Sequence, residues 1–498
     1  MDFVCNFPAF SIVLSMMGAI VSSALKGKWA KHLNMVILFI VMLMSLCVLG
    51  YTLQTGEFFV YTMGKFPAPW GNEIRAGVLE GLMATFFCII MILSLLGGRK
   101  HFYQDVEEDR RNLYFIMTDL LLGSLLAMVY TNDLFTAYVF VEINTIAACG
   151  LIMIIRNGRT IEAAIRYMIM SLLGSGLFLI GICILYDLTG HLLMSSLKES
   201  VANLVSQGEY VIPLTMTIAL MSVGLAIKSA LFPFHAWLPD AYGYSTISSA
   251  AMLSSLVSKG YIFLVIKIMY RVIGFDVFAN SKIINILFVF GILGMIIGSV
   301  SAIKENDIMR MIAFSSVAQI GYIYMGFGLG SQAGMIASVF HIFSHAATKA
   351  LLFVAAMGLR DASGGSKAFI DLTGAGRRHL WAGIGFTVGG LSMVGIPTFS
   401  GFVSKLLFSQ AAIFSNHKML IALIALAVST ILNAIYFMKT IIRIYSAPGE
   451  EIAAGTQKCK SDIRYILTIV SFLLLNVLLG MSSTVFYFLI EKGLIMFD

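Results

Sequence analysis

Residues 221–242 read MSVGLAIKSALFPFHAWLPDAY, an apolar run in which Lys228 is followed five positions later by Pro233. A proline inside a helix removes one backbone hydrogen bond, and its ring clashes with the carbonyl four residues earlier. The helix is therefore expected to open next to Lys228. Freed backbone groups persist at membrane depth only against protein or a water-filled cavity, so the stretch predicts a broken helix with a functional lysine beside it.

The composition of the chain is that of a membrane protein. Of its 498 residues, 59% are hydrophobic and only 12% are charged, which leaves too little polar surface to cover a soluble particle of this size. Its apolar stretches are long enough for α-helices to cross about 30 Å of hydrocarbon. We therefore predict an all-α polytopic membrane protein. Fourteen transmembrane helices are expected at 7–25, 34–53, 79–97, 112–129, 134–154, 163–187, 213–233, 247–270, 283–302, 308–328, 333–357, 382–412, 419–442 and 465–489.

Basic residues are divided unequally between the two sets of loops that alternate along the chain. The loops after the odd-numbered helices hold 21 lysines and arginines, and the opposite loops hold 8, among them Lys267 and Arg271. Since basic residues near helix ends favour the cytoplasmic side, we predict a cell-membrane protein with both termini outside. No cleavable signal peptide is expected, because the opening residues MDFVCNF lack a basic segment. The net charge of +7 thus reflects topology and indicates no nucleic-acid partner.

Four further lysines lie inside predicted helices, namely Lys228, Lys259, Lys349 and Lys405. A charged side chain at the membrane centre costs at least about 2.5–3.5 kcal/mol, so these positions are candidates for ion translocation. Glu142, within LFTAYVFVEINTIAACGLI, is the matching acid, because a buried Glu–Lys pair can keep both charges or exchange a proton. Two alternatives stay open: structural lysines, and a Glu142 that only bonds a neighbouring helix.

A histidine and lysine stripe runs along one predicted helix. The segment VFHIFSHAATKALLF places His341, His345 and Lys349 at successive steps of four, which is one face of a helix. A zinc site is not expected, because residue 342 is Ile rather than Glu and no third ligand is evident. Imidazoles beside a buried lysine favour a proton relay. Histidines that merely pack between helices remain the alternative.

A second broken helix is predicted from GGLSMVGIPTFSGFVSKLLF at 389–408, in which Pro397 precedes Lys405. The order of proline and lysine is the reverse of that at Lys228 and Pro233, as expected for inverted repeats with discontinuous helices. We expect helices 4–8 and 9–13 to form two inverted five-helix repeats, with helices 7 and 12 broken. The predicted regions are 1–111 for three N-terminal helices, 112–270 for the first repeat, 271–445 for the second repeat, and 446–498 for a cytoplasmic loop and the last helix.

Four ordered motifs carry a resemblance to a known family. They are LAIKSALFPFHAWLPDAY at 225–242, AFSSVAQIGYI at 313–323, the pattern HxxxHAxxKALLF at 341–353 and GIPTFSGFVSK at 395–405. Together they resemble the antiporter-like subunits shared by respiratory complex I, the Mrp multisubunit sodium/proton antiporters and the group 4 membrane-bound nickel–iron hydrogenases. The resemblance covers helices 4–13.

This resemblance implies roles for the candidate residues. It implies that Glu142 pairs with Lys228, and that Lys405 is the terminal site of proton exchange. Lys259 would act with the histidine and lysine stripe as the central relay. In the same motif His235 and Asp240 are candidates for proton uptake from the cytoplasm.

Two sequence details bear on the subfamily and on the uptake route. The lysine at 405, where one branch of complex I subunits has a glutamate, and the stretch FPAPWGNEI at 66–74 resemble the Mrp D-type subunit and its hydrogenase counterpart. The family usually has a histidine near position 242 and an APTPVS-like segment after it. This chain instead has Tyr242 and GYSTISSA, so the family's usual route for proton entry from the cytoplasm, at helix 8, is in question.

The function expected from these features is ion translocation without bond chemistry in this chain. Protons, with sodium ions as the alternative, would be moved within a redox-driven multisubunit pump, most similar to a group 4 membrane-bound hydrogenase. The alternatives are a D-type subunit of an Mrp antiporter without redox partners, a complex I pumping subunit, a secondary transporter for a small solute, and a membrane scaffold.

Cofactors are expected in partner subunits only. No phosphate-binding GxxxxGK[ST] motif and no CxxC pair is present, so no cofactor or metal is expected here. Nickel–iron, iron–sulfur or flavin centres would belong to the partners. Those partners are expected to include other membrane subunits, a second antiporter-like subunit among them, and a peripheral redox arm.

Overall fold

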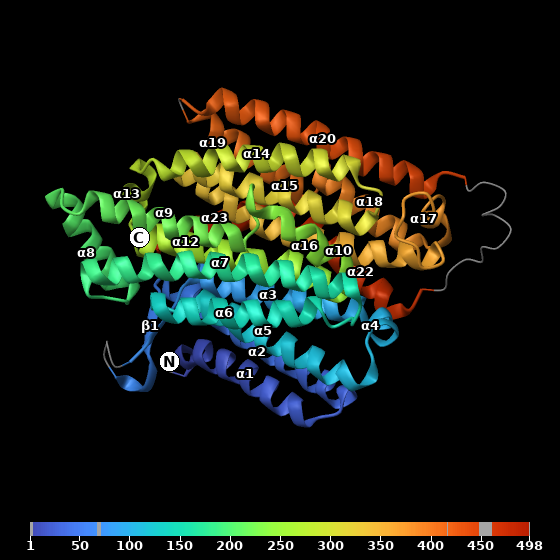
Figure 1. Cartoon of the computed structure of the whole chain (residues 1–498), viewed down its shortest axis with the longest axis horizontal. Helices are drawn as coiled ribbons and strands as arrows, with labels where there is room; N and C mark the ends of the chain where they lie inside the picture. The colour runs from blue at the N-terminus through green and yellow to red at the C-terminus, as the bar shows by residue number, and fades with distance from the viewer. Residues whose placement is uncertain (1–2, 67–70, 416, 448–460, 498) are drawn as a thin grey trace.

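The chain forms a bundle of long helices that run side by side, as the computed structural model shows (Figure 1). The structure describes residues 3–66, 71–415, 417–447 and 461–497. Within these ranges, 13 helices are long and apolar enough to cross a membrane. The predicted all-α membrane architecture is therefore confirmed. Residues 67–70 of the FPAPWGNEI stretch and most of the loop predicted after residue 446 lie outside the described residues.

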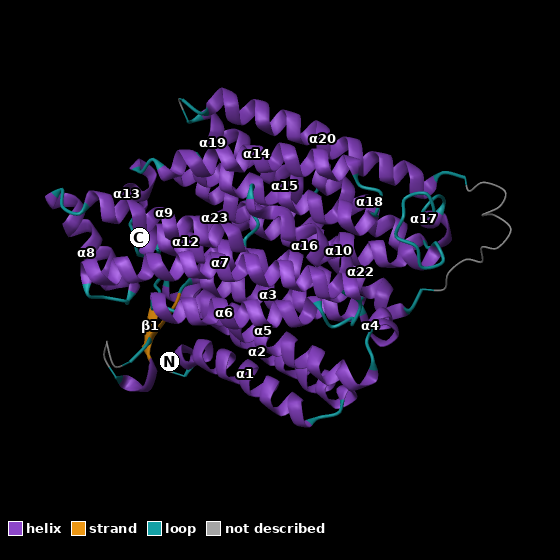
Figure 2. Ribbon diagram, viewed as in Figure 1, coloured by secondary structure: helices purple, strands orange, loops and turns teal. Residues whose placement is uncertain are grey.

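The N-terminal part consists of three long helices, a short ribbon and short helical turns. The two strands pair antiparallel, with Phe59 opposite Ala76, and they are the only strands in the described ranges (Figure 2). The elements are η1 (Val4–Asn6), α1 (Phe7–Ala24), α2 (Gly27–Thr55), β1 (Phe59–Thr62), η2 (Met63–Lys65), β2 (Glu73–Ala76), α3 (Val78–Gly97), α4 (Arg99–Asp105) and η3 (Glu108–Arg110).

The next part of the chain corresponds to predicted helices 4–8. Its elements are α5 (Arg111–Tyr130), α6 (Leu134–Ile152), α7 (Gly158–Thr189), α8 (Met194–Gln207), α9 (Val211–Lys228), η4 (Phe234–Trp237), α10 (Leu238–Tyr244), α11 (Ile247–Met252), the π-helical η5 (Leu253–Val257), α12 (Ser258–Arg271) and α13 (Phe275–Asn280).

The last part corresponds to predicted helices 9–14. Its elements are α14 (Ile283–Lys304), α15 (Ile308–Gly328), α16 (Gln332–Ala362), α17 (Ala375–Arg378), α18 (Leu380–Val394), α19 (Ser400–Ile413), α20 (Met419–Tyr445), α22 (Ile463–Met481) and α23 (Ser483–Ile495). The predicted span 382–412 is the pair α18 and α19, neither of which alone reaches the length of a membrane span. The fourteenth predicted crossing therefore corresponds to two short helices rather than to one of the 13 spanning helices.

Helix starts follow from side-chain caps in the sequence. Asp133 accepts a hydrogen bond from the backbone N–H of Thr136 at the start of α6. Asp307 accepts from Met309 and Arg310 at the start of α15. Such caps satisfy backbone donors that have no partner within the helix.

The last predicted span, 465–489, is divided into two helices. α22 ends at Met481 and α23 begins at Ser483, and Gly480 lies just before this junction. A Cβ added at Gly480 would lie 2.3 Å from the carbonyl oxygen of Thr398, and one added at Gly493 would lie 2.6 Å from Leu79 Cβ. The bend thus lets α22 pass against the break between α18 and α19 while α23 packs on α3.

Four of the candidate residues, Lys259, His341, His345 and Lys349, lie in the interior of the bundle. All residues in the apolar windows of α16 and of the segment α11–η5–α12 are buried, and 94% of those in α15 are. The corresponding windows of α1 and α2 are only 33% buried. The helices that carry His341, Lys259 and Lys349 are therefore surrounded by other helices, whereas α1 and α2 lie at the periphery.

The loops fall into two groups at opposite ends of the bundle. Both chain ends lie at the end marked by β1, α8 and α13, while α4 and α17 lie at the other end (Figure 1). Loops predicted to be cytoplasmic meet at the α4 end, where Lys100 Nζ lies 2.8 Å from Asp361 and Lys367 Nζ donates to the carbonyl of Gly243 at 3.0 Å. The side on which this end lies stays a prediction.

The prediction that Lys267 and Arg271 lie in a loop is wrong. Both are in α12, with exposed fractions of 0% and 2%. Lys267 Nζ donates to the carbonyls of Met128 and Val129, at 3.3 and 2.8 Å, and also to that of Thr131. These carbonyls lie at the end of α5 and lack partners within the helix, so a buried cation is well placed to satisfy them.

Candidate functional site

The first broken helix opens at the predicted place. α9 ends at Lys228, and Ala230 adopts a left-handed backbone with φ +61°. Pro233, preceded by a cis peptide bond, is exposed. The indole N–H of Trp237 donates to the carbonyl of Ile227 at 3.3 Å. One carbonyl freed by the break is thus satisfied from within the protein.

Lys228 and Glu142 are brought together, as the resemblance implied. Lys228 Nζ lies 3.9 Å from Glu142 Oε1 and donates a shorter bond, of 2.7 Å, to Thr145 Oγ1. Glu142 and Thr145 are three residues apart on α6, so one helix face presents both. The Lys228 side chain is fully buried, whereas 24% of the Glu142 side chain is exposed. The pair is a loose contact that can separate while the lysine keeps its hydroxyl partner.

Lys259 lies directly after a π-helical turn. Its Nζ donates to the carbonyl of Ser254 and to Ser258 Oγ, the latter at 3.1 Å. The π-helix spans Leu253–Val257, and such turns free backbone groups from the regular ladder. Tyr242, the residue that departs from the family pattern, donates its hydroxyl to the carbonyl of Leu253 at 3.2 Å. Tyr242 therefore hydrogen-bonds the π-helical turn that precedes Lys259.

A chain of polar contacts connects Lys259 to Lys349. Ser254, whose backbone carbonyl accepts from Lys259, shares a hydrogen bond of 3.1 Å between its Oγ and Ser316 Oγ. Ser316 Oγ donates to the carbonyl of Ile312 at 3.2 Å, and Lys349 Nζ donates to the same carbonyl at 2.9 Å. Lys349 also bonds Ser315 Oγ. The fully buried Lys259 and Lys349 are thus linked through Ser316 Oγ and the carbonyl of Ile312, both in α15.

The two histidines of α16 lie parallel and close together. Their ring centroids are 5.8 Å apart with an interplanar angle of 7°. His341 Nδ1 shares a hydrogen bond of 2.6 Å with Ser404 Oγ. Within the described part of the chain, His341 Nε2 and both ring nitrogens of His345 have no hydrogen-bond partner. Buried polar atoms of this kind are normally satisfied by internal water.

Lys405 lies beside the second break. α18 ends at Val394, Gly395 has φ +94° and Thr398 has φ +81°, and α19 begins at Ser400. Pro397 is exposed within this break. Lys405 Nζ reaches back across it and donates to the carbonyl of Val394 at 2.6 Å.

Lys405 is connected to the histidines by one aromatic ring. Its Nζ lies 5.9 Å from the centroid of the Tyr322 ring, which stacks on His341 at 5.5 Å. The neighbouring residue, Ser404, bonds His341 directly. The structure therefore brings together Lys405, His341 and His345, while Lys228 and Glu142 form a separate pair.

Sequence reasoning missed Asn476, a buried residue of α22. Its Oδ1 accepts the backbone N–H of Ser400 at 3.3 Å, and its Nδ2 donates to Thr348 Oγ1 at 2.7 Å. Asn476 thus caps the broken half-helix α19 from another helix and ties it to α16. An isolated asparagine inside an apolar span is the signal that could have identified it.

The residues proposed for uptake lie at the α4 end of the bundle. Asp240 Oδ2 lies 2.9 Å from Arg166, and its other oxygen pairs with Arg310, which also lies 3.1 Å from Glu305. His235 packs against the ring of Phe232 at 5.5 Å. Asp240 is therefore held in an ion-pair network rather than free, while His235 keeps one buried ring nitrogen without a partner in the described ranges.

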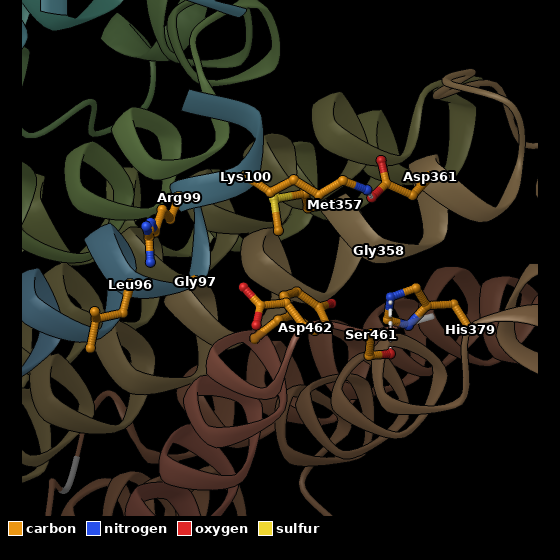
Figure 3. Close-up of a pocket in the computed structure, with 11 residues that line it drawn as sticks. Leu96, Gly97, Arg99, Lys100, Met357, Gly358, Asp361, His379, Ser461 and Asp462 are labelled. Carbon is orange, nitrogen blue, oxygen red and sulfur yellow. Dashed lines mark hydrogen bonds and ion pairs between the residues drawn. The ribbon is translucent and has the colours of Figure 1, made fainter. Parts of the chain in front are cut away.

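A cavity of about 270 Å³ opens at the same end, where α16 ends and α18 begins (Figure 3). Asp361 accepts from Lys100 at 2.8 Å and lies 2.6 Å from the ring nitrogen of His101. His379 Nδ1 accepts the N–H of Ala382 and so caps α18. Burial lowers the pKa of His379 below its ordinary value. Titratable side chains thus line an opening at the end of α16, the helix that carries His341, His345 and Lys349, and at the start of α18.

Comparison with known proteins gives a consistent result. Residues 131–432 match the family described as NADH:quinone oxidoreductase/Mrp antiporter, TM. The chain is 32% identical to NADH-quinone oxidoreductase subunit N of Desulforudis audaxviator over 80% of its length and 77% of that protein. It is 28% identical to the D-type subunit of the Na(+)/H(+) antiporter of Alkalihalophilus pseudofirmus, over 85% of this chain and 83% of that one.

Two solved structures share the fold. One is the membrane-bound sulfane sulfur reductase, an archaeal respiratory membrane complex, with a TM-score of 0.88 and 24% identity over 100% of this chain and 98% of the other. The second is the Mrp complex from Dietzia sp. DQ12-45-1b, with a TM-score of 0.86 and 22% identity over the same shares. Both likenesses cover the full bundle.

Proposed function

Because this chain belongs to the NADH:quinone oxidoreductase/Mrp antiporter transmembrane family, we propose that it conducts protons, with sodium ions as the alternative, along its buried lysines and histidines. It is an antiporter-like membrane subunit of the complex I and Mrp type. The observation that carries the proposal is the polar chain from Lys259 through Ser254 and Ser316 to Lys349. Buried charges joined in this way are costly, which favours a functional role over a structural one.

The proposed cycle begins at the pair formed by Lys228 and Glu142. The two charges are held at 3.9 Å while Lys228 keeps its bond to Thr145, so a charge arriving near the partly exposed Glu142 can draw the carboxylate away. Lys228 then loses its neutralising partner and gives up a proton toward Lys259. Water in the interior would carry the proton over the separation between them.

The second part of the proposed cycle runs from Lys259 to Lys405. Serine hydroxyls and the carbonyl of Ile312 would hold water and protons between Lys259 and Lys349. From there His345 and His341 would pass the proton to Lys405, with Ser404 fixing the His341 ring. Lys405 would exchange the proton with the outside of the protein.

For the complex, we propose a redox-driven ion pump of the group 4 hydrogenase type. A relative that is a subunit of an NADH-quinone oxidoreductase supports a redox partner, while a relative that is a sodium/proton antiporter subunit supports an Mrp-type complex equally. In either case the partners would be other membrane subunits. Nickel–iron, iron–sulfur or flavin centres would lie in a peripheral arm, and the cell membrane would hold the chain with both termini outside.

The complex can be identified by purifying it in mild detergent and determining its composition by mass spectrometry. Partners with nickel-ligand cysteines would support the hydrogenase type, and flavin-binding partners a complex I relative. Small membrane subunits without any redox protein would contradict the redox-driven proposal and leave the Mrp type.

The mechanism is tested by replacing Lys228 with alanine in the intact complex. We expect ion transport per assembled complex to fall at least about tenfold, because the buried pair loses its cation. The control is Lys282→Ala, which removes an exposed lysine before α14. Full transport by Lys228→Ala in an assembled complex would overturn the proposed cycle.

A further inference from the structure

We propose that a cavity between α2, α4, α5 and α22 binds the phosphate headgroup of an anionic phospholipid. Its volume is about 1300 Å³, far more than inorganic phosphate fills. Six basic residues and two acidic ones line it, which gives the lining a formal charge of +4. The basic residues are Lys26, Lys28, Lys31, Arg99, Arg111 and Arg464, and the acidic ones are Glu108 and Asp109. This proposal is independent of the proposed ion transport.

The basic side chains have little else to neutralise them. Within the described ranges, none of the six is in an ion pair with a carboxylate. Arg111 donates instead to the backbone carbonyls of Tyr103 and Val106, at 3.1 and 3.3 Å. Arg99 lies apart from the neighbouring Lys100–Asp361 pair (Figure 3). The cavity therefore concentrates positive charge that its two acidic residues do not neutralise, which makes it attractive to an anion.

Two of the cations are held in place by an aromatic ring. Lys31 Nζ lies 5.4 Å from the centroid of the Tyr103 ring, and the Arg111 guanidinium lies 4.9 Å from it. Cation–π contacts of this kind orient a charged group before a ligand arrives. The part of the site formed by α2, α4 and α5 is thus preorganised, whereas Lys26, Lys28 and Arg464 are exposed and can close around the ligand.

The position of the cavity favours a lipid over a soluble anion. It lies where the membrane helices α1, α2 and α22 begin or end, and Trp29 at its edge is 64% exposed, as in an interfacial aromatic anchor. Apolar residues also line it, among them Leu25, Met35 and Leu96.

An exposed apolar face continues from the cavity along α1 and α2. On it Ile20 is 61% exposed, Val36 54% and Phe39 53%. This face can take the acyl chains of a lipid whose headgroup occupies the basic cavity. Basic pockets between membrane helices are a recognised form of binding site for anionic lipid headgroups.

The proposal is tested with the full chain, purified in its complex and placed in nanodiscs. The cavity variant combines Lys26→Gln, Lys28→Gln and Arg464→Gln. The matched control combines Lys304→Gln, Arg377→Gln and Lys439→Gln, three exposed basic residues outside the cavity. Native mass spectrometry measures phosphatidylglycerol retained from nanodiscs in which phosphatidylcholine is the major lipid. A parallel arm adds inorganic phosphate instead.

We expect the wild type and the control to retain phosphatidylglycerol, and the cavity variant to bind it on the order of a hundredfold more weakly, since each lost cation near the membrane weakens the attraction. Equal retention by the cavity variant would overturn the proposal. So would thermal stabilisation by inorganic phosphate equal to that by phosphatidylglycerol, which would indicate a free-anion site. Cross-links from Lys26 or Lys28 to a partner protein that fills the cavity without lipid would also overturn it.

Discussion

Lys228 is the last residue of the first half of its broken helix, whereas Lys405 lies in the second half of the other broken helix. Lys228 is fully buried and has a carboxylate, Glu142, at 3.9 Å. Lys405 is partly exposed and, among the described residues, lies within 4.0 Å of no carboxylate. Its Nζ instead donates to the carbonyl of Val394, at the end of α18.

This difference indicates two ways to keep an ammonium group inside a membrane. Lys228 is the last residue of α9, and the Nζ of Lys405 reaches the last residue of α18, so both ammonium groups lie at the C-terminal end of a half-helix, where unpaired carbonyls carry partial negative charge. At Lys228 the carboxylate of Glu142 adds its negative charge to that of the carbonyls, and this contribution is lost when Glu142 moves away. At Lys405 the carbonyl of Val394 and the Tyr322 ring contribute but no carboxylate of the described residues does, so its charge depends on what approaches from outside. The first site is thus suited to switching and the second to exchange.

The largest loss of stability is expected from a substitution at Gly401, next to the second break. A Cβ added at Gly401 would lie 1.8 Å from the carbonyl oxygen of Ser392, and that carbonyl belongs to backbone that cannot move aside. We expect Gly401→Ala to destabilise the protein by about 3 kcal/mol or more, so that little complex assembles. The control is Gly176→Ala on α7, where no atom lies within 4 Å. Quantifying assembled complex by native electrophoresis would show equal amounts of both if the packing described here were wrong.

Charge coupling should occur at the first break only. In a double-mutant cycle on transport rates, Glu142→Gln and Lys228→Met should show an interaction free energy of about 0.5–3 kcal/mol, as residues in contact do. Glu142→Gln and Lys405→Met share no described partner and should be additive within about 0.5 kcal/mol. An equal interaction in both cycles would show that the two lysines are not distinguished by Glu142.

Asn476 should matter for stability more than for transport. Asn476→Leu removes the cap on the N–H of Ser400 and should lower stability by about 0.5–2 kcal/mol. Asn285→Leu, at an exposed position of α14, is the control. Thermal denaturation and transport per assembled complex are both measured. A large loss of transport at normal stability would mean that Asn476 takes part in the relay.

The smallest expected effect is on stability, and it comes from relieving backbone strain at one residue in each break. Ala230 and Thr398 both have left-handed backbone, with φ +61° and +81°. Thr398 is exposed, so Thr398→Gly should stabilise by about 0.5–1 kcal/mol. Ala230 is fully buried, and the loss of its packed methyl group should offset the gain in Ala230→Gly. Melting temperatures that rise equally for both variants would contradict this distinction.

Much of the fold and of the site follows from local sequence. Hydropathy located the 13 helices of the described ranges that are long and apolar enough to cross a membrane. Pro233 and Pro397 marked both breaks, because a proline acts within four residues of itself. Spacing by four placed His341, His345 and Lys349 on one face, since helical periodicity is local as well.

The remaining features depend on contacts between distant parts of the chain. Lys267 and Arg271 lie near a helix end and resemble loop charges until the end of α5 is placed beside them. Asp240 is held by arginines that lie 74 and 70 residues away in sequence. The bend at residue 482 follows Gly480 and depends in addition on packing against α3 and the second break.

The central claim is that the buried lysines and the polar groups between them carry the transported ion. It is tested most directly by measuring ion translocation of the assembled complex in vesicles with Lys349→Met, beside Lys304→Met, which removes an exposed lysine at the end of α14. The account predicts that Lys349→Met assembles and loses translocation at least about tenfold, while Lys304→Met matches the wild type. Wild-type translocation by Lys349→Met would contradict it.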